Sequence, residues 1–228
     1  MAATETEQPI TASTTEQDVA DNDQAIPHVT RVFYITPHGN TKQAIKIHDL
    51  TNKLSKLEYS TEIEEEAEKL GQSLADETPL YTIVQPGWWK TITLYAGAAQ
   101  AEGENTSEAL ITWKPSGAAH SKQSFNFPES SPFSSHDLTM RLTGSFFTRN
   151  EAFVKDSVQY LWRFDSKWQY KHTLYKKIGQ SEMCVAKFRT PFRAYKTGGT
   201  VFVNEDEIDA VVATITSCAM LRKIRQRR

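Results

Sequence analysis

The sequence predicts a mainly β fold: a closed antiparallel β-barrel around a buried, hydrophobic C-terminal helix. Short runs rich in β-branched and aromatic residues alternate with turn signals along most of the chain, which is typical of sandwiches and barrels. Long helical patterns do not separate these runs, which argues against βαβ units. Near the C-terminus a longer run is apolar on every side, and such a helix is expected inside a protein rather than on its surface.

Roughly ten or eleven strands can be recognised from the β-branched runs. The first two, around 30–36 and 44–48, flank a Pro-His-Gly-Asn turn and are expected to form a hairpin. A loosely specified segment rich in Ser, Pro and Gly, 115–136, is expected to contain one strand around 125–127. The other runs lie at 80–84, 88–95, 109–113, 138–142, 160–164, 170–175, 183–189 and 200–203.

Composition indicates one intracellular domain. The chain has 228 residues, 39% of them hydrophobic, and a net charge of -2 that gives no overall attraction to nucleic acid or anionic membranes. Its two cysteines form no CxxC pair, so neither a disulfide framework nor a cysteine zinc site is indicated. The start lacks the apolar segment of a secretory signal, and the longest apolar-rich run, 208–221, is shorter than the roughly 20 residues that span a bilayer. We therefore expect a cytoplasmic protein, with peripheral membrane contact left open.

The domain organisation follows from charge. Residues 1–28 contain six acids and no Lys or Arg, and are expected to form a disordered acidic leader because they cannot bury enough surface to offset their ordering entropy. The barrel domain is expected over 29–228. Within it, 54–77 contains eight acids, which favours a short acidic helix or a mobile insertion whose charges form a solvated face.

The central helix is expected over about 206–221. Asn204 with Glu207 three residues later is close to a capping box, and acids at the start with bases at the end complement a helix dipole. The β-branched run 211–216 leaves a strand as the alternative, but the caps and the length favour a helix. Fourteen residues give roughly 21 Å of helix, close to the height of a barrel whose strands have six or seven residues. The residues predicted to be buried on this helix are Ile208, Val211, Val212, Ile215 and Cys218.

The last third of the chain resembles a known family. The order Tyr160-Leu161-Trp162-Arg163, Val185-Ala186-Lys187-Phe188, Thr200-Val201-Phe202-Val203 and Asp209 to Thr214, followed by a basic end, resembles the C-terminal half of tubby-like domains. The likeness is greatest to a fungal group of unknown function in the clan that also holds the LURP-one-related proteins and phospholipid scramblases. It implies a barrel of about twelve strands around a hydrophobic central helix. Tubby proteins bind phosphoinositides, so the resemblance implies lipid contact, although their basic residues match no position here.

Bases are concentrated in the C-terminal half. Ten bases and only three acids lie between Lys155 and Lys196, interleaved with Trp168, Tyr170 and Tyr175. Such a surface can hold anionic lipid headgroups, since each base near an anionic membrane contributes about 1 kcal/mol. The alternative is that outward strand positions carry Lys and Arg for solubility. The residues predicted to contact lipid are Lys167, Lys171, Lys176, Lys177, Lys187 and Arg189.

The basic tail and a pair of tryptophans can each be explained either by a function or by the fold alone. The basic tail 222–228 is either a second membrane contact or the end of a helix kept in water. Trp88 and Trp89 point to opposite faces of a strand. Core and rim packing explains them most simply, and the alternative is a ligand mouth or a membrane interface.

No catalytic pattern is found. The six histidines are scattered without metal-ligand spacing, and the chain has no GxSxG elbow, P-loop or GxGxxG. Ser134-Ser135-His136-Asp137 contains the residue types of a triad, but adjacent residues cannot converge on one point. We therefore predict no enzyme activity, no cofactor and no metal.

The predicted function is a non-enzymatic binding module of tubby-like type that contacts anionic membrane lipid, such as phosphoinositide, through its basic C-terminal half. The alternatives are a protein-interaction domain that uses the acidic insertion 54–77, and a carrier of a small apolar ligand. Nucleic acid is excluded as a partner because the acidic leader would compete for the same bases.

Overall fold

The computed structural model describes residues 26, 28–37, 44–74, 76–86, 90–100, 108–117, 121–129, 131–143, 150–165, 171–190 and 198–226, with side chains up to 221 in the last range. Trp88, Trp89, Lys167, the side chains of the basic tail and nearly all of the acidic leader lie outside these residues. Ile26, within the expected leader, and Val29, the first residue of the expected domain, are both buried against the domain.

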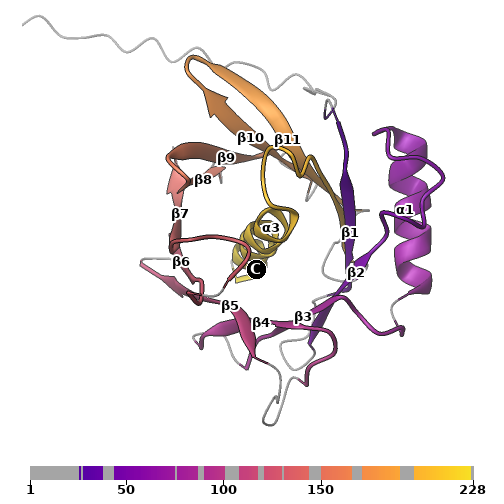
Figure 1. The fold of residues 1–228 in the computed structure, drawn as a ribbon, viewed down its shortest axis with the longest axis horizontal. Helices are drawn as coiled ribbons and strands as arrows, with labels where there is room; N and C mark the ends of the chain where they lie inside the picture. The colour runs from indigo at the N-terminus through magenta and orange to yellow at the C-terminus, as the bar shows by residue number, and fades with distance from the viewer. Residues whose placement is uncertain are drawn as a thin grey trace, which may run out of the picture.

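Twelve antiparallel strands close into a barrel, which confirms the predicted mainly β class and the closed antiparallel barrel (Figure 1). Each strand pairs with its neighbours in the chain, and β1 pairs with β12 to close the ring. The strand that the sequence did not indicate is β8, whose Asn150, Glu151 and Lys155 hide the β pattern. The strands are β1 (Arg31–Ile35), β2 (Ile45–Asp49), β3 (Tyr81–Val84), β4 (Ile92–Ala96), β5 (Ala109–Ser116), β6 (Lys122–Asn126), β7 (Leu138–Thr143), β8 (Asn150–Lys155), β9 (Val158–Phe164), β10 (His172–Ile178), β11 (Ser181–Arg189) and β12 (Gly199–Val203).

Helix α3 (Ala210–Gln226) begins later than the sequence indicated. Asn204 caps a separate turn, since its side-chain oxygen accepts from the backbone N–H of Asp206. Asp209 is the N-cap of α3, because its carboxylate accepts from the N–H groups of Val211 and Val212, each at 2.9 Å. The predicted bounds of 206–221 are therefore wrong at both ends, since a capped turn precedes the helix and its backbone continues to Gln226.

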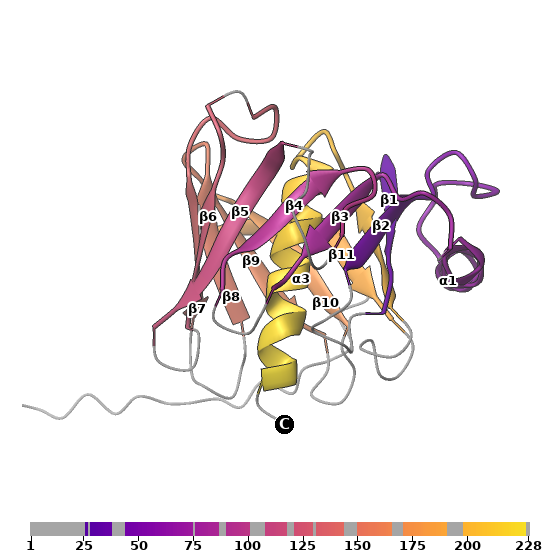
Figure 2. The same cartoon turned by 90° about the horizontal axis from the view of Figure 1, so that it is seen from below.

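Residues 210–221 of α3 are all buried, and the apolar residues among them share one apolar cluster with residues of the strands. Figure 1 shows the α3 ribbon within the ring of strands, and in Figure 2 it runs along the barrel toward the C-terminus. Two polar contacts fix its register: the Trp162 indole N–H donates to Thr216 at 3.0 Å, and His172 Nε2 lies 2.9 Å from the Ser217 hydroxyl. A buried indole N–H needs such a partner, which makes this contact selective for one helix position.

Helix α1 (Thr61–Ser73) is the acidic insertion, and it lies on the outside of the barrel beside β1 and β12 (Figure 1). Its buried face carries Ile63, Ala67 and Gly71. With Val32, Tyr34 and Phe202 from the outward faces of β1 and β12, this face forms a second apolar cluster. The insertion is therefore an ordered helix rather than a mobile segment.

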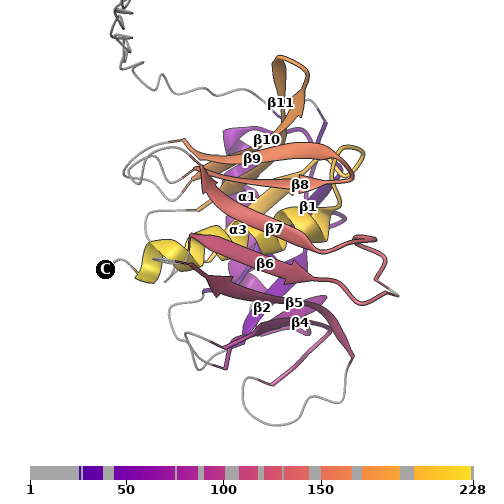
Figure 3. The ribbon, with the colours of Figure 1, turned by 90° about the vertical axis from the view of Figure 1, so that its left-hand side faces the viewer.

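The connections between strands lie alternately at the two ends of the barrel. We call the end where β12 leads into α3 the entry rim, and the end toward which the C-terminus of α3 points the exit rim (Figure 2). Val203, Lys155 and Ile178 are strand ends at the entry rim, and Ile35, Phe164 and Arg189 are strand ends at the exit rim. The β10–β11 hairpin extends beyond its neighbours (Figure 3) and carries the exposed Ile178.

Replacing Val212 by Asp should unfold the domain or cost several kcal/mol, because it places an unpaired charge where the side chain is 0% exposed. Val154→Asp is the matched control, since Val154 is 53% exposed at the end of β8. Urea unfolding followed by circular dichroism measures both. Equal stability of the two variants would contradict burial of this face of α3.

Asp209 should make the stability of the domain depend on pH. Burial raises the pKa of this carboxyl above its ordinary value of 3.8, against the two backbone hydrogen bonds that lower it. In the window from 3.8 up to the folded-state pKa, the folded state binds more protons than the unfolded state, so the free energy of unfolding falls as the pH rises. Asp209→Asn keeps a hydrogen-bond acceptor and removes the charge. The free energy of unfolding of this variant, relative to wild type, should therefore increase as the pH rises through that window. Urea unfolding at a series of pH values tests this, and a constant difference would contradict it.

Candidate functional site

The structure divides the bases that were predicted to contact lipid into two groups. Lys171, Lys187 and Arg189 lie on β10, β11 and the connection before β10, on the outer wall near the exit rim. Lys176 and Lys177 lie toward the entry rim at the end of β10. Lys167 lies outside the described residues. One continuous patch of all five described bases is therefore not formed.

Arg189 is at the centre of the first group. It is 7% exposed, and its guanidinium pairs with Asp165 Oδ2 at 2.8 Å and with Glu64 Oε1 at 3.0 Å. It also donates to the Tyr59 hydroxyl at 2.7 Å and to the carbonyl of Phe188 at 2.9 Å. Burial opposes its charge, but the neighbouring Asp165, Tyr59 and Glu64 raise the pKa of Arg189 above its ordinary value. This network joins segments that lie 125 residues apart in the chain.

Lys187 is fully buried beside this network. Its side chain is 0% exposed, and its ammonium lies 4.5 Å from the centroid of the Tyr59 ring, which is a cation–π contact. Lys187 pairs in register with Phe202 of β12, and the Tyr59 ring meets Phe202 edge-on at 5.3 Å. Tyr59 thus covers both a cation and an aromatic ring of the outer wall.

The half-buried lysines also have acidic partners. Lys171 pairs with Glu64 at 3.6 Å, and Lys176 pairs with Glu207 at 2.7 Å. Among the five described bases, Lys177 is the exposed one at the tip of the β10–β11 hairpin. In this arrangement the bases mainly hold α1 and the entry to α3 in place.

Local sequence explains how α1 reaches the wall. Ser60 is its N-cap and accepts from the N–H of Ile63, and Glu62 and Glu64 lie in the first turn, where carboxylates interact favourably with the helix dipole. Gly71 lets the helix approach closely, because a Cβ at this position would lie 2.2 Å from the Tyr34 ring. The helix then places Glu64 over Lys171 and Arg189.

The residues predicted to be buried on the central helix are all buried in the structure. Ile208 lies in the turn before α3, and the other four belong to the helix. The exposed fractions are 4% for Ile208, 6% for Val211, 0% for Val212 and Ile215, and 8% for Cys218. Burial raises the pKa of Cys218 to about 12 and that of Cys184 to about 11, so neither thiol is poised as a nucleophile.

The histidine-containing segment does not form a triad. Ser135 Oγ lies 3.4 Å from His136 Nδ1, and Asp156 Oδ1 lies 3.7 Å from the same nitrogen. A nucleophile and an orienting carboxylate need opposite nitrogens of the imidazole. Asp137 is used elsewhere, since it accepts from Asn126 and from the N–H of Phe127.

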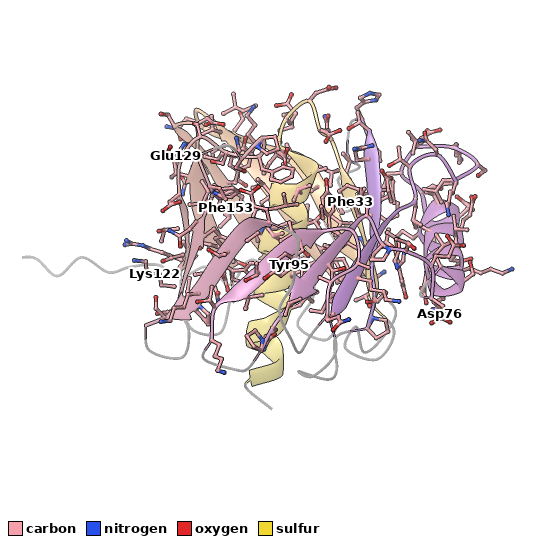
Figure 4. The ribbon with its side chains drawn as sticks, turned by 60° about the horizontal axis from the view of Figure 1, so that its bottom comes forward. Phe33, Asp76, Tyr95, Lys122, Glu129 and Phe153 are labelled. Carbon is pink, nitrogen blue, oxygen red and sulfur yellow. The ribbon has the colours of Figure 1, made fainter. Side chains whose placement is uncertain are left out.

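A second basic surface, which sequence reasoning missed, lies on the outer wall of β5 to β7. Lys122 and Arg141 are directly opposite each other across β6 and β7, and Lys114 is the diagonal neighbour of Lys122 across β5 and β6. None of the three forms an ion pair with a residue that the structure describes. Figure 4 shows Lys122 on the outside of the barrel. Strand alternation could have placed each of these bases outside, but only the strand register brings them together.

Neither a metal site nor a membrane-spanning helix is found in the described part of the chain. No three His, Cys, Asp or Glu side chains there are grouped so that they could hold a metal ion. No helix within it has the length and apolar character needed to cross a bilayer.

Comparison with known proteins adds no relative. No protein-family model, curated protein or solved structure matches this chain. The resemblance to tubby-like domains therefore remains a prediction.

Arg189→Met should cost about 3–5 kcal/mol, because it leaves Glu64 and Asp165 partly buried without their cation. Arg163→Met is the control, since the Arg163–Glu182 pair is more exposed and exposed pairs contribute about 0.2–1 kcal/mol. Urea unfolding of both variants measures the difference. A loss at Arg189 no larger than at Arg163 would show that the network does not anchor α1.

Proposed function

We propose that this protein is a non-enzymatic binding module that contacts an anionic membrane surface with the exit rim of its barrel. The observation that carries the proposal is the separation of charge between the two rims. It follows from the strand topology together with the composition of the segments that join the strand ends.

The entry rim is acidic. Apart from 50–80, whose helix α1 lies on the outer wall, the segments that join strand ends there or lead into α3 contain ten acids and no Lys or Arg. Among the described residues, Asp156, Glu205, Asp206 and Glu207 lie in its turns, and Figure 4 shows Glu129 at the same end. The segments counted are 97–108, 127–137, 156–157, 179–180 and 204–209.

The sequence segments that lead to the exit rim are rich in bases. The segments that join strand ends there, with the end of α3, contain twelve bases and one acid. Lys90 and Lys171 belong to the described part of these segments, whose other bases mostly lie outside it. The same segments contain three of the five tryptophans of the chain, Trp88, Trp89 and Trp168. Trp and Tyr side chains are enriched at membrane interfaces. The segments are 36–44, 85–91, 117–121, 144–149, 165–171, 190–198 and 222–228.

The outer wall of β5 to β7 extends this basic surface toward the exit rim. Lys122 is the first residue of β6 and therefore lies at that rim, directly opposite Arg141. Like charges that face each other across two strands are destabilising, so an anion bound between them relieves the repulsion. Each base near an anionic membrane contributes about 1 kcal/mol, and the attraction falls as salt is added.

The filled interior of the barrel favours binding on its outer surface over binding of a ligand inside. We include in the proposal that α3 is the central helix that fills the barrel, supported by its buried residues and by the Trp162 and His172 contacts. A barrel filled in this way has little space for a small apolar ligand, which makes the carrier hypothesis less favourable. The tubby-like resemblance is part of the same proposal, because it too implies a helix-filled barrel and lipid contact.

A second candidate function is protein interaction through α1. The buried face of α1 is fixed to the wall, Glu62 and Glu65 are exposed on the helix, and Glu58 is exposed in the segment just before it. A rigid acidic surface of this kind is suited to a basic partner. The insertion also covers part of the second apolar cluster, so charge reversal of these acids is a better probe than deletion.

Co-sedimentation of the full chain with vesicles containing phosphatidylserine tests the membrane proposal. Replacing Lys122 and Arg141 by Gln together should weaken binding by about thirtyfold, since two bases contribute about 2 kcal/mol. Binding should also fall between low and physiological salt. Adding a phosphoinositide to the vesicles distinguishes general charge attraction from recognition of that headgroup.

Lys177→Gln is the matched control for this experiment, because Lys177 is exposed at the entry rim and should not affect binding. An equal loss for Lys177→Gln would contradict the assignment to the exit rim. No binding of the wild type at low salt would exclude the membrane function and favour the acidic surface of α1.

A further inference from the structure

We propose that α1 is a built-in cover: its Glu64 carboxylate occupies an anion-binding position on the outer wall, and lifting the helix exposes cations that strengthen the contact with an anionic membrane. This inference rests on the proposed membrane function and describes its regulation. Three cations meet beneath the first turns of α1, namely Lys171, Lys187 and Arg189.

Glu64 behaves as the resident anion of this position. Its two oxygens reach Arg189 at 3.0 Å and Lys171 at 3.6 Å, so one carboxylate pairs with two cations. Asp165 belongs to the wall itself and pairs with Arg189 from the other side. With α1 in place, three cations and two carboxylates leave a net charge of 3 − 2 = +1, and without Glu64 the same wall has 3 − 1 = +2.

The cover can move without breaking the barrel. Helix α1 is inserted between β2 and β3, and the closed ring of strand pairs does not include it. It is held by one apolar face and by the contacts of Tyr59 and Glu64. Bound and lifted arrangements of α1 therefore differ in side-chain packing rather than in strand hydrogen bonds.

An anionic surface would favour the lifted arrangement because it competes with Glu64 for Lys171 and Arg189, which lie near the exit rim. A ligand shifts an equilibrium between two conformations by the difference in its affinity for them. The lifted arrangement binds an anionic surface more tightly because its cations are no longer paired with Glu64.

Two variants weaken the cover in different ways. Glu64→Gln removes the resident anion while it keeps the shape of the side chain. Gly71→Ala places a methyl group 2.2 Å from the Tyr34 ring and forces the helix away from the wall. Glu65→Gln is the control, because it removes one charge from the exposed side of the same helix.

The first measurement is co-sedimentation with phosphatidylserine vesicles at low salt. Glu64→Gln should bind about fivefold more tightly than Glu65→Gln, the effect of about one further cation at an anionic surface. Equal binding of the two variants would overturn the cover while leaving the membrane function intact, provided that the Lys122 and Arg141 double variant still binds less than wild type.

The second measurement does not depend on membranes. Reductive methylation of surface amines followed by mass spectrometry should leave Lys187 unmodified in the wild type, where it is 0% exposed, and modify it in Gly71→Ala and more weakly in Glu64→Gln. Circular dichroism shows whether each variant is folded. If Lys187 stays protected in both folded variants, α1 is a fixed part of the wall and the cover is excluded, even where no variant binds vesicles.

Discussion

The pairing of β1 with β12 is the constraint on which the rest of this structure depends. It joins the first and last strands of the domain into one ring, so no strand edge is left to pair with another chain. A closed sheet has an inner face that must be filled, and the buried residues of α3 share one apolar cluster with that face. Because all twelve strands are antiparallel neighbours in sequence, every second connection lies at the same rim. Closure thereby sorts the loops of the chain into two groups.

The net charge of -2 does not reveal that acids and bases are concentrated in different sets of connections. In the sequence, the connections at the entry rim other than 50–80 contain ten acids and no Lys or Arg, and those at the exit rim with the end of α3 contain twelve bases and one acid. Net charge reports the sum and is insensitive to this arrangement. The outer wall of β5 to β7, with Lys114, Lys122 and Arg141, adds a basic surface to the exit side.

The ion network under α1 has a different character from these surface charges. Buried ion pairs contribute little net stability, since desolvation offsets much of the attraction, but removing one partner is costly. Arg189 and Glu64 therefore specify where α1 docks more than they stabilise the fold. The apolar contacts of Ile63 and Ala67 supply the attraction, and the close approach of Gly71 to Tyr34 sets the distance. A helix held by few specific contacts is a natural place for regulation.

Local pattern was sufficient for most strands and for an apolar C-terminal helix, because β-branched runs, turn residues and a missing polar stripe are properties of neighbouring residues. It was insufficient for β8, where polar residues flank the short apolar run Ala152-Phe153-Val154. It was also insufficient for the start of α3, where Asn204 and Asp209 are both capping residues. The ion network beneath α1 was harder to predict than the strands and the helix. Sequence grouped Lys187 and Arg189 with exposed bases, because both occupy outward strand positions. Only the tertiary structure covers them, since the helix that buries them is encoded more than a hundred residues earlier. The sequence determined which residues face outward, and the packing of α1 decided which of those remain in contact with water.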